Sequence, residues 1–363
     1  MRFAVAGLGH FAQAAVLPAF AQAEGCELRA LFSSDEAKRR ALARKYKAVA
    51  FSYDAYDEYL RSGEVDAVYV AVPNDLHADF AIRAARAGVH VLCEKPLAPD
   101  AGAATRIVAA CHENGVKLMV AYRLHFEAGN LEAIERIRRG DLGRPRFMST
   151  TFALQVRAGN IRTKRARAGG PLLDLGVYCV NAARYLFRAE PTAVTAMAAT
   201  TKGEARFAEI EEQVSAILKF PDERTAQLTC SFGAYDHSTL TVVGTKGLLK
   251  LDPAYDYATA IVLQSEIEGR KPTRKVFPKT DQVAAELVGF ARGVRGQAKL
   301  EPSGEEGLAD LRVMDALRRS LESGRTESVA AVERSHRPSK RQTIRRRPHG
   351  MPSLVNALSG SRP

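Results

Sequence analysis

Several features that define other protein classes are missing from this 363-residue chain. Its five cysteines are scattered without a C-x-x-C pair, which argues against a disulfide framework and against a zinc site. The histidines show no H-E-x-x-H spacing, so no metal is expected. No run of 18 apolar residues occurs, and the chain opens on a predicted strand without a charged and apolar leader. We therefore expect a cytoplasmic protein with no membrane span.

The excess of positive charge is concentrated at one end. The net charge is +12, and residues 331–363 contain eight Lys or Arg against one Glu. Arg345–Arg347 is the one dense cluster, and no aromatic residues interleave with it to stack bases, so no nucleic-acid partner is expected. A solvated, disordered extension is the default prediction for this basic tail, and docking on the body, on a second subunit or on an acidic partner is the alternative.

The first twelve residues predict a strand, a glycine turn and the start of a helix. Phe3–Ala6 is apolar, Gly7-Leu8-Gly9 follows, and a helix-forming segment begins at His10 and Phe11. A helix that begins there directs unpaired N–H groups and the positive end of its dipole toward the turn, which suits a diphosphate. Glycines also let the backbone approach the diphosphate closely. The motif therefore favours dinucleotide binding over a plain tight turn.

The end of the second predicted strand indicates which nicotinamide cofactor is preferred. Leu28–Phe32 is followed by Ser33-Ser34-Asp35 and, one turn into the next helix, by Lys38–Arg40. NAD preference usually shows an acidic residue at this strand tip, whereas a 2′-phosphate needs hydroxyl donors and cations. The pattern favours NADP, with NAD possible. Alternatively, Ser34 or Asp35 caps the helix and Lys38–Arg40 is a solvated helix face.

Two more buried strands end in residues that suggest a site. The apolar run Val65–Val72 is followed by Pro73, Asn74 and His77, and Val89–Cys93 is followed by Glu94-Lys95-Pro96. Ligands of open α/β sheets bind beyond the carboxyl ends of the strands, so these residues should border the cofactor. His77 alone would more often be a helix-start or packing residue, and Lys95 alone a surface lysine.

The chain is long enough for two domains and a tail. A strand over Lys117–Ala121, followed by Tyr122 and Arg123, completes a six-strand pattern typical of a doubly wound Rossmann domain over residues 1–123. Alternating strands predict an open, mainly antiparallel sheet in an α+β domain over 124–330, and 331–363 is a basic extension.

A helix over Leu172–Phe187 interrupts the second domain after Gly169-Gly170-Pro171. Asp174, Tyr178 and Asn181 recur at spacings of four and three, which places them on one face. They could line a cleft, but on spacing alone a buried hydrogen-bonded pair is the better interpretation.

Taken in order, these motifs resemble the glucose-fructose oxidoreductase and inositol dehydrogenase family, Gfo/Idh/MocA. The resemblance implies that Tyr178 is the acid/base, Lys95 its electrostatic partner and Asp174 the orienting group, whereas many members carry His in place of Tyr178. A tyrosine at this position makes the chain resemble the glucose-fructose oxidoreductase branch and the dihydrodiol dehydrogenases. Subunit pairing across the open sheet, as a homodimer or homotetramer, is also implied. The expected cofactor-binding residues are Gly7, Leu8, Gly9, His10, Phe11, Ser33, Ser34, Lys38, Pro73, Asn74, His77, Glu94, Lys95 and Arg123.

The function expected from this resemblance is NADP-dependent hydride transfer at a sugar or polyol carbon, as in glucose-fructose oxidoreductase. A dihydrodiol dehydrogenase or another carbohydrate dehydrogenase of the family is the first alternative. A protein that binds NADP without turnover and serves a regulatory role is the second. Substrate choice is expected to reside in loops such as Gln155–Ala168, which is rich in Arg and Lys.

Overall fold

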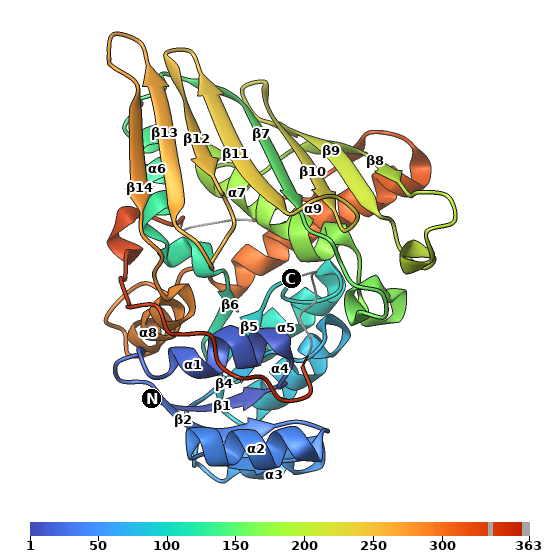
Figure 1. Ribbon diagram of the computed structural model, residues 1–363, viewed down its shortest axis with the longest axis vertical. Coiled ribbons are helices and arrows are strands. Elements are labelled where there is room, and N and C mark those ends of the chain that lie inside the picture. Colours follow the sequence, from blue (N-terminus) through green and yellow to red (C-terminus); the bar gives the residue numbers. More distant parts are fainter. Residues whose placement is uncertain (333–336, 358–363) are drawn as a thin grey trace. The chain divides into compact units, whose positions relative to one another are not determined.

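The computed structural model describes residues 1–332 and 337–357 (Figure 1). It contains two compact units, neither of which is one continuous stretch of chain. The first comprises Met1–Phe126, Thr280–Gly307 and the described residues from Ile344 on, and the second Glu127–Lys279 and the described part of Leu308–Thr343. The continuous domain bounds given by the sequence stay a prediction. The two units differ from those bounds because residues 280–307 and 344–357 belong to the first unit.

The first unit is built on a six-stranded sheet in which every pair of neighbours is parallel. The strand order β3-β2-β1-β4-β5-β6 reverses direction between β1 and β4, which is the doubly wound arrangement. The predicted Rossmann fold is therefore confirmed. The strands are β1 (Arg2–Ala6), β2 (Glu27–Phe32), β3 (Val49–Phe51), β4 (Ala67–Val70), β5 (His90–Glu94) and β6 (Leu118–Ala121).

Helices flank this sheet, and α2 and α3 lie below β1 and β2 in the view of Figure 1. Asp35 and Asp100 begin two of them by accepting a hydrogen bond from the backbone N–H three residues on. The helices are η1 (Ala12–Val16, a π-helix), α1 (Leu17–Ala19), α2 (Glu36–Tyr46), α3 (Tyr56–Arg61), α4 (His77–Arg86), α5 (Ala101–Glu113) and α8 (Gln282–Val294), with short 3-10 turns η2 (Tyr53–Ala55), η3 (Asn74–Leu76) and η4 (Arg123–Phe126).

Helix α8 completes the core of the first unit from late in the sequence. The Phe290 ring lies 6.0 Å from the ring of Phe3, and both side chains are fully buried. Residue Val120 on β6 donates its N–H to the carbonyl of Pro302. Burial of rings of this size stabilises the fold by about 2–3 kcal/mol each, so the sheet depends on these returning residues.

The second unit is built on a nine-stranded sheet of order β14-β13-β12-β11-β7-β10-β9-β8-β15. Only β10 and β7 pair in parallel among its described neighbours, which confirms the open, mainly antiparallel sheet. The strands are β7 (Pro145–Ala153), β8 (Ala193–Ala199), β9 (Gln213–Phe220), β10 (Arg224–Ser231), β11 (His237–Gly244), β12 (Gly247–Asp252), β13 (Ile261–Ile267), β14 (Thr273–Phe277) and β15 (Glu327–Ser328).

Alternation along the strands buries one face of this sheet. In β10, for example, Ala226, Leu228 and Cys230 are buried whereas the residues between them are not. The helices of the unit are α6 (Ala128–Arg138), η7 (Leu172–Gly176, a π-helix), α7 (Val177–Phe187) and α9 (Gly304–Ser323, which begins in the first unit), with short turns η5 (Ile161–Thr163), η6 (Arg165–Arg167), η8 (Ala205–Phe207) and η9 (Lys340–Gln342).

A buried ionic network joins α7 to α9. The Arg184 guanidinium, which is fully buried, donates to Asp310 at 2.5 Å and to Glu190 at 2.5 Å and 2.9 Å. Asn181 donates to the other oxygen of Asp310, and Arg337 donates to Glu190. Because every charge in the network is paired, the network can be buried without an isolated ion.

The described part of the tail has defined contacts, so the default prediction of a solvated extension is wrong for it. Residues 344–357 pack on the first unit, where Asp281 donates its N–H to the carbonyl of Arg346. The other tail residues of that prediction, 333–336 and 358–363, lie outside the described residues.

Candidate active site

The glycine turn leaves β1 in a backbone conformation that only glycine tolerates. Gly7 has a φ of +97°, and a Cβ placed on it would lie 2.3 Å from the carbonyl oxygen of Ala71. A Cβ on Gly9, in contrast, would meet nothing within 4 Å. The helix begins at His10, directly after Gly9, so the positive end of its dipole lies at the turn, which favours an anionic group such as a diphosphate.

The tip of β2 carries the hydroxyl and cationic groups that the sequence indicates. Ser34 is exposed, whereas Ser33 is buried and accepts through Oγ from the N–H of Asp35. Arg39 donates to the Ser33 carbonyl at 2.7 Å, and the Lys38 ammonium lies 3.9 Å from Asp35. The Lys38 amide that donates to Asp35 holds the pKa of this carboxyl below its ordinary value, so the group is ionised at neutral pH. Asp35 is thus the helix cap of the alternative interpretation.

His77 joins the loops that follow β4 and β5. It is 1% exposed, with Nδ1 at 2.8 Å from the Pro96 carbonyl and Nε2 at 2.9 Å from the Val72 carbonyl. Burial lowers the pKa of His77, whereas the two carbonyls favour the protonated ring, because donating to both of them requires both N–H groups. The histidine therefore fixes the loop of Pro73 and Asn74 relative to that of Lys95, and the Lys95–Pro96 peptide bond is cis.

A chain of buried hydrogen bonds lies beneath Lys95. The Tyr69 hydroxyl is 2.6 Å from Oε1 of Glu94 and 3.2 Å from Oε1 of Glu286, and Glu94 also accepts from the Lys95 N–H. One phenol carries one proton, so when it donates to Glu94 it must accept from Glu286. Burial raises the pKa of both carboxyls, that of Glu286 most, which agrees with a protonated Glu286.

Arg123 has a structural partner that the sequence did not reveal. Its side chain is buried, and Nη1 donates to Oε1 of Gln282 on α8 at 2.6 Å. A contact of Arg123 with the nicotinamide or with substrate stays a prediction.

In the second unit, Asp174 lies on the π-helix η7 and forms an ion pair with the loop before it. Nε of Arg162 is 3.1 Å from Oδ2 of Asp174. Gly169 permits this loop conformation, since a Cβ on it would lie 2.2 Å from the Arg162 carbonyl oxygen. Arg162 is the functional candidate that motif reading missed, and the basic composition of its loop was the available signal.

Tyr178 is the second residue of α7 and packs among aromatic rings. Its ring lies 5.7 Å from that of Phe152 and 6.0 Å from that of Tyr255, and the residue is 8% exposed. Asn181, three residues on, donates instead to Asp310 in the ionic network. Of the three residues that the spacing grouped, Asn181 therefore serves packing.

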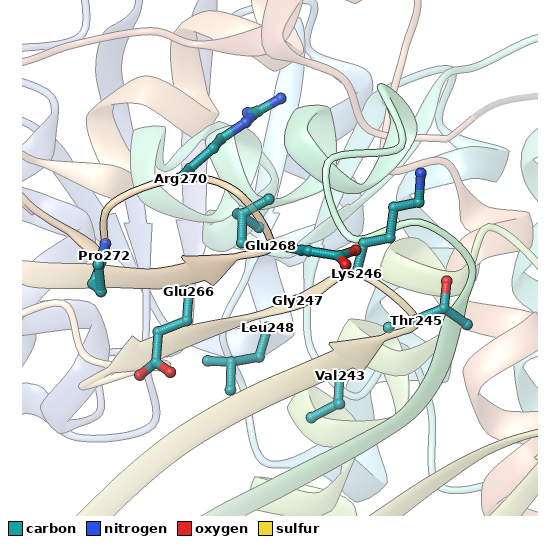
Figure 2. A pocket seen from close by; sticks show the side chains of 11 residues that line it. Val243, Thr245, Lys246, Gly247, Leu248, Glu266, Glu268, Arg270 and Pro272 are labelled. Carbon is teal, nitrogen blue, oxygen red and sulfur yellow. The ribbon is translucent and has the colours of Figure 1, made fainter.

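Two hollows of the second unit are lined by other residues. The one in Figure 2 lies at the turn between β11 and β12 and is lined by residues such as Thr245, Lys246 and Glu268. The other is bordered by Ala158, Lys164, Glu204 and Arg206, so part of the basic loop Gln155–Ala168 forms its wall. Neither hollow includes a predicted catalytic residue.

Nothing described in the structure suggests a metal or a membrane span. Over residues 1–332 and 337–357, no cluster of three or more His, Cys, Asp or Glu side chains is arranged to hold a metal ion. Within the same ranges no helix is long and apolar enough to cross a bilayer.

Comparison with known proteins identifies the family. A model described as an oxidoreductase family with an NAD-binding Rossmann fold matches residues 1–122, and the model of the GFO/IDH/MocA C-terminal domain matches residues 130–250. The chain belongs to the Gfo/Idh/MocA oxidoreductase family. This confirms the resemblance, the enzyme class and a nicotinamide dinucleotide as cofactor.

Several relatives of this Gfo/Idh/MocA protein have named activities. D-xylose 1-dehydrogenase (NADP(+)) 2 of Haloferax volcanii is 33% identical over 92% of this chain and 99% of its own. An aldose-aldose oxidoreductase from Caulobacter crescentus, solved with glycerol, is 35% identical with a TM-score of 0.86, and the match covers 91% of this chain and 99% of that one. A 3-ketoreductase from Actinomadura kijaniata, solved with NADP and TDP-benzene, is 27% identical with a TM-score of 0.80, over 88% and 98% of the two chains. It has also been solved as a lysine-to-alanine and as a tyrosine-to-phenylalanine variant.

Proposed function

We propose that this protein is an NADP-dependent oxidoreductase that transfers a hydride between the nicotinamide and a sugar or polyol carbon. The observation that carries the proposal is the open glycine turn of a family Rossmann fold, combined with named sugar dehydrogenases among full-length relatives. NADP is preferred to NAD because Ser34 and Lys38 offer a hydroxyl and a cation at the tip of β2.

The residues proposed to hold the cofactor follow the carboxyl edge of the sheet. Gly7, Gly9 and the helix that starts at His10 bind the diphosphate, and Leu8 and Phe11 border it. Pro73, Asn74 and the Glu94–Lys95 loop, fixed by His77, border the nicotinamide. When bound, the nicotinamide supplies the hydride acceptor or donor, and the protein supplies position and field.

The proton is handled by the chain itself. Tyr178 takes the proton from the substrate hydroxyl during oxidation and returns it during reduction. Lys95 adds positive charge that stabilises the developing alkoxide, and Asp174 orients the substrate hydroxyl. The 3-ketoreductase relative has been solved with a lysine and with a tyrosine replaced, the two residue types to which the charge and proton-transfer roles are assigned here.

Three alternatives differ in substrate or in turnover. A glucose-fructose type of cycle retains the nucleotide and couples oxidation of one sugar to reduction of another. A dihydrodiol dehydrogenase or another freely exchanging carbohydrate dehydrogenase releases the nucleotide each cycle. A regulatory protein binds NADP without turnover, but it would not need Lys95, Asp174 and Tyr178.

The first test is to release any nucleotide from the purified protein with acid, identify it, and then assay aldoses and polyols with NADP+. Retained NADP(H) indicates the glucose-fructose type of cycle, and an empty protein that reduces NADP+ indicates free exchange. Tyr178→Phe should lower kcat by about 10²–10⁴-fold, whereas the control Tyr235→Phe, at an 87% exposed tyrosine, should leave it unchanged. Unchanged turnover in Tyr178→Phe would rule out the assigned acid/base.

The assembly and location remain part of this proposal. Phe147, Ile217 and Met197 are exposed on one face of the second unit's sheet, at 44%, 53% and 77%. Apolar side chains on an open sheet face suit the pairing of two copies of the chain into a cytoplasmic homodimer or homotetramer. Light scattering on Ile217→Lys should then show a shift toward smaller species.

A further inference from the structure

The last described residues of the chain contact two parts of the proposed nucleotide site. One part is the glycine turn, which would bind the diphosphate, and the other is the tip of β2, which would face the adenosine ribose. Residues 351–357 lie within the first unit, and the red C-terminal segment passes α1 in Figure 1. The tail therefore meets the cofactor unit at the end that binds the adenosine.

The first contact is made by Gln13 at the start of the helix. Its Oε1 accepts from the N–H of Val355 at 2.8 Å, and its Nε2 donates to the Val355 carbonyl at 2.9 Å. Nε2 also donates to the carbonyl of Leu8 in the glycine turn at 2.9 Å. Since Gln13 is 1% exposed, these three bonds satisfy a buried amide and tie the tail to the turn itself.

The second contact occupies the carboxylate at the tip of β2. Nδ2 of Asn356 donates to Oδ2 of Asp35 at 3.3 Å, while Oδ1 of Asp35 accepts from the Lys38 N–H at 3.0 Å. Both oxygens thus have protein donors. Asn356 has a φ of +46°, a left-handed conformation that asparagine adopts more readily than most residues. An acidic residue near this tip is what a ribose 2′-hydroxyl would bind.

Two further anchors hold the tail before these contacts in the chain. The Lys45 ammonium donates to the Ser353 carbonyl at 3.1 Å, and Arg346 forms a 3.6 Å ion pair with Glu24. The segment is therefore fixed before it reaches Gln13, which favours a permanent position over a chance encounter.

We propose that residues 351–357 are a wall of the cofactor site, which slows release of the nucleotide, and that Asn356 withholds Asp35 from the ribose 2′-hydroxyl and so favours NADP over NAD. This inference rests on the proposed function only for the identity of the nucleotide. It adds a specificity determinant that lies about 320 residues from the strand it serves.

The test measures nucleotide dissociation, with no sugar present. NADPH is bound to the full chain, displaced with excess NADP+, and followed by fluorescence. A chain that ends at Gly350 should release NADPH at least about tenfold faster, equivalent to about 1.4 kcal/mol. The matched control ends at Ala357, retains the wall and should release NADPH at the full-length rate. Equal rates for all three chains would overturn the proposal.

Two substitutions separate specificity from structure. Asn356→Gly keeps the left-handed backbone and removes the bond, whereas Asn356→Asp places a second carboxylate against Asp35. Both should reduce the ratio of NADH to NADPH dissociation constants by about threefold to tenfold, the aspartate more. Glu24→Gln, which removes an exposed anchor remote from the turn, should leave this ratio unchanged.

Hydrogen exchange distinguishes a tail that borders the nucleotide from a tail that only stabilises the fold. NADPH should increase protection of the Val355 amide, which donates to Gln13, in proportion to nucleotide occupancy. Unchanged protection at saturating NADPH would show that the tail only staples the fold. Failure of the full chain to bind NADPH would overturn the proposed function as well, whereas normal binding with unaltered dissociation in the variants overturns this inference alone.

Discussion

The glycine turn of the first unit and the helix of the second hold their functional groups by different means. At the turn, backbone conformation sets the arrangement: Gly7 lies against the Ala71 carbonyl, and a Cβ on Gly9 would meet nothing within 4 Å. On the helix, side chains from distant segments decide: Arg162 pairs with Asp174, and Phe152 and Tyr255 surround Tyr178. An arrangement that backbone conformation holds is specified by a few neighbouring residues. An arrangement that side chains from distant segments hold forms only when the whole unit folds.

The largest effect is expected from a substitution that disrupts the backbone conformation of the glycine turn. Gly7→Ala should lower the free energy of unfolding by about 4 kcal/mol, because the φ of +97° is strained for alanine and its Cβ would overlap the backbone of Ala71 and Val72, just after β4. Gly9→Ala is the matched variant, with no atom within 4 Å of its Cβ. It should keep its stability and lose nucleotide affinity. Urea denaturation and NADPH titration of both variants check this contrast, and equal stabilities would contradict it.

The next largest effect is expected from disrupting a side-chain arrangement of the second unit, the buried ionic network around Arg184. Arg184→Met leaves Asp310 and Glu190 without their main cation, so unfolding should become easier by about 3 kcal/mol. Arg138→Met removes a comparable but exposed ion pair with Glu135, and no measurable change is expected. Thermal unfolding of both variants tests whether burial sets the cost.

The smallest effect concerns Glu286, because the first unit also contains an arrangement held by side chains, the hydrogen bond between Glu286 and Tyr69. Its pKa is raised by burial, so its contribution to stability is full below its ordinary pKa and falls as the pH rises toward the folded-state value. Glu286→Gln keeps a donor for Tyr69 without the titration. The variant should gain about 1 kcal/mol on the native chain between pH 5 and pH 8.

Urea unfolding at both pH values measures this difference, with Glu135→Gln as the control of opposite sign. Arg138 lowers the pKa of Glu135, so its small contribution is present at neutral pH and lost as the pH falls through the lowered pKa. A native chain whose stability does not change relative to Glu286→Gln would mean that Glu286 titrates normally.

The same contrast explains what could be read from the sequence. The alternation of apolar runs and turns predicted β1, β2, β5 and β6 to within one residue at each end, because their order depends on local pattern. The run Val65–Val72 exceeded β4 by four residues, since apolar residues also line the loop ends. The pairings Arg162–Asp174, Tyr69–Glu286 and Gln13–Val355 had no local signal, because their partners are brought together only by tertiary folding.

The return of 280–307 and 344–357 to the first unit also has a consequence for synthesis. On the ribosome, Phe3 and its sheet emerge first but obtain the Phe290 ring only after Glu127–Lys279 of the second unit has been made. At about 5–20 residues per second, residues 126 to 344 take roughly 10–45 s to translate. Over that interval the first unit is incomplete, so the second unit is inserted into it and the unit that begins the chain is the last to be completed.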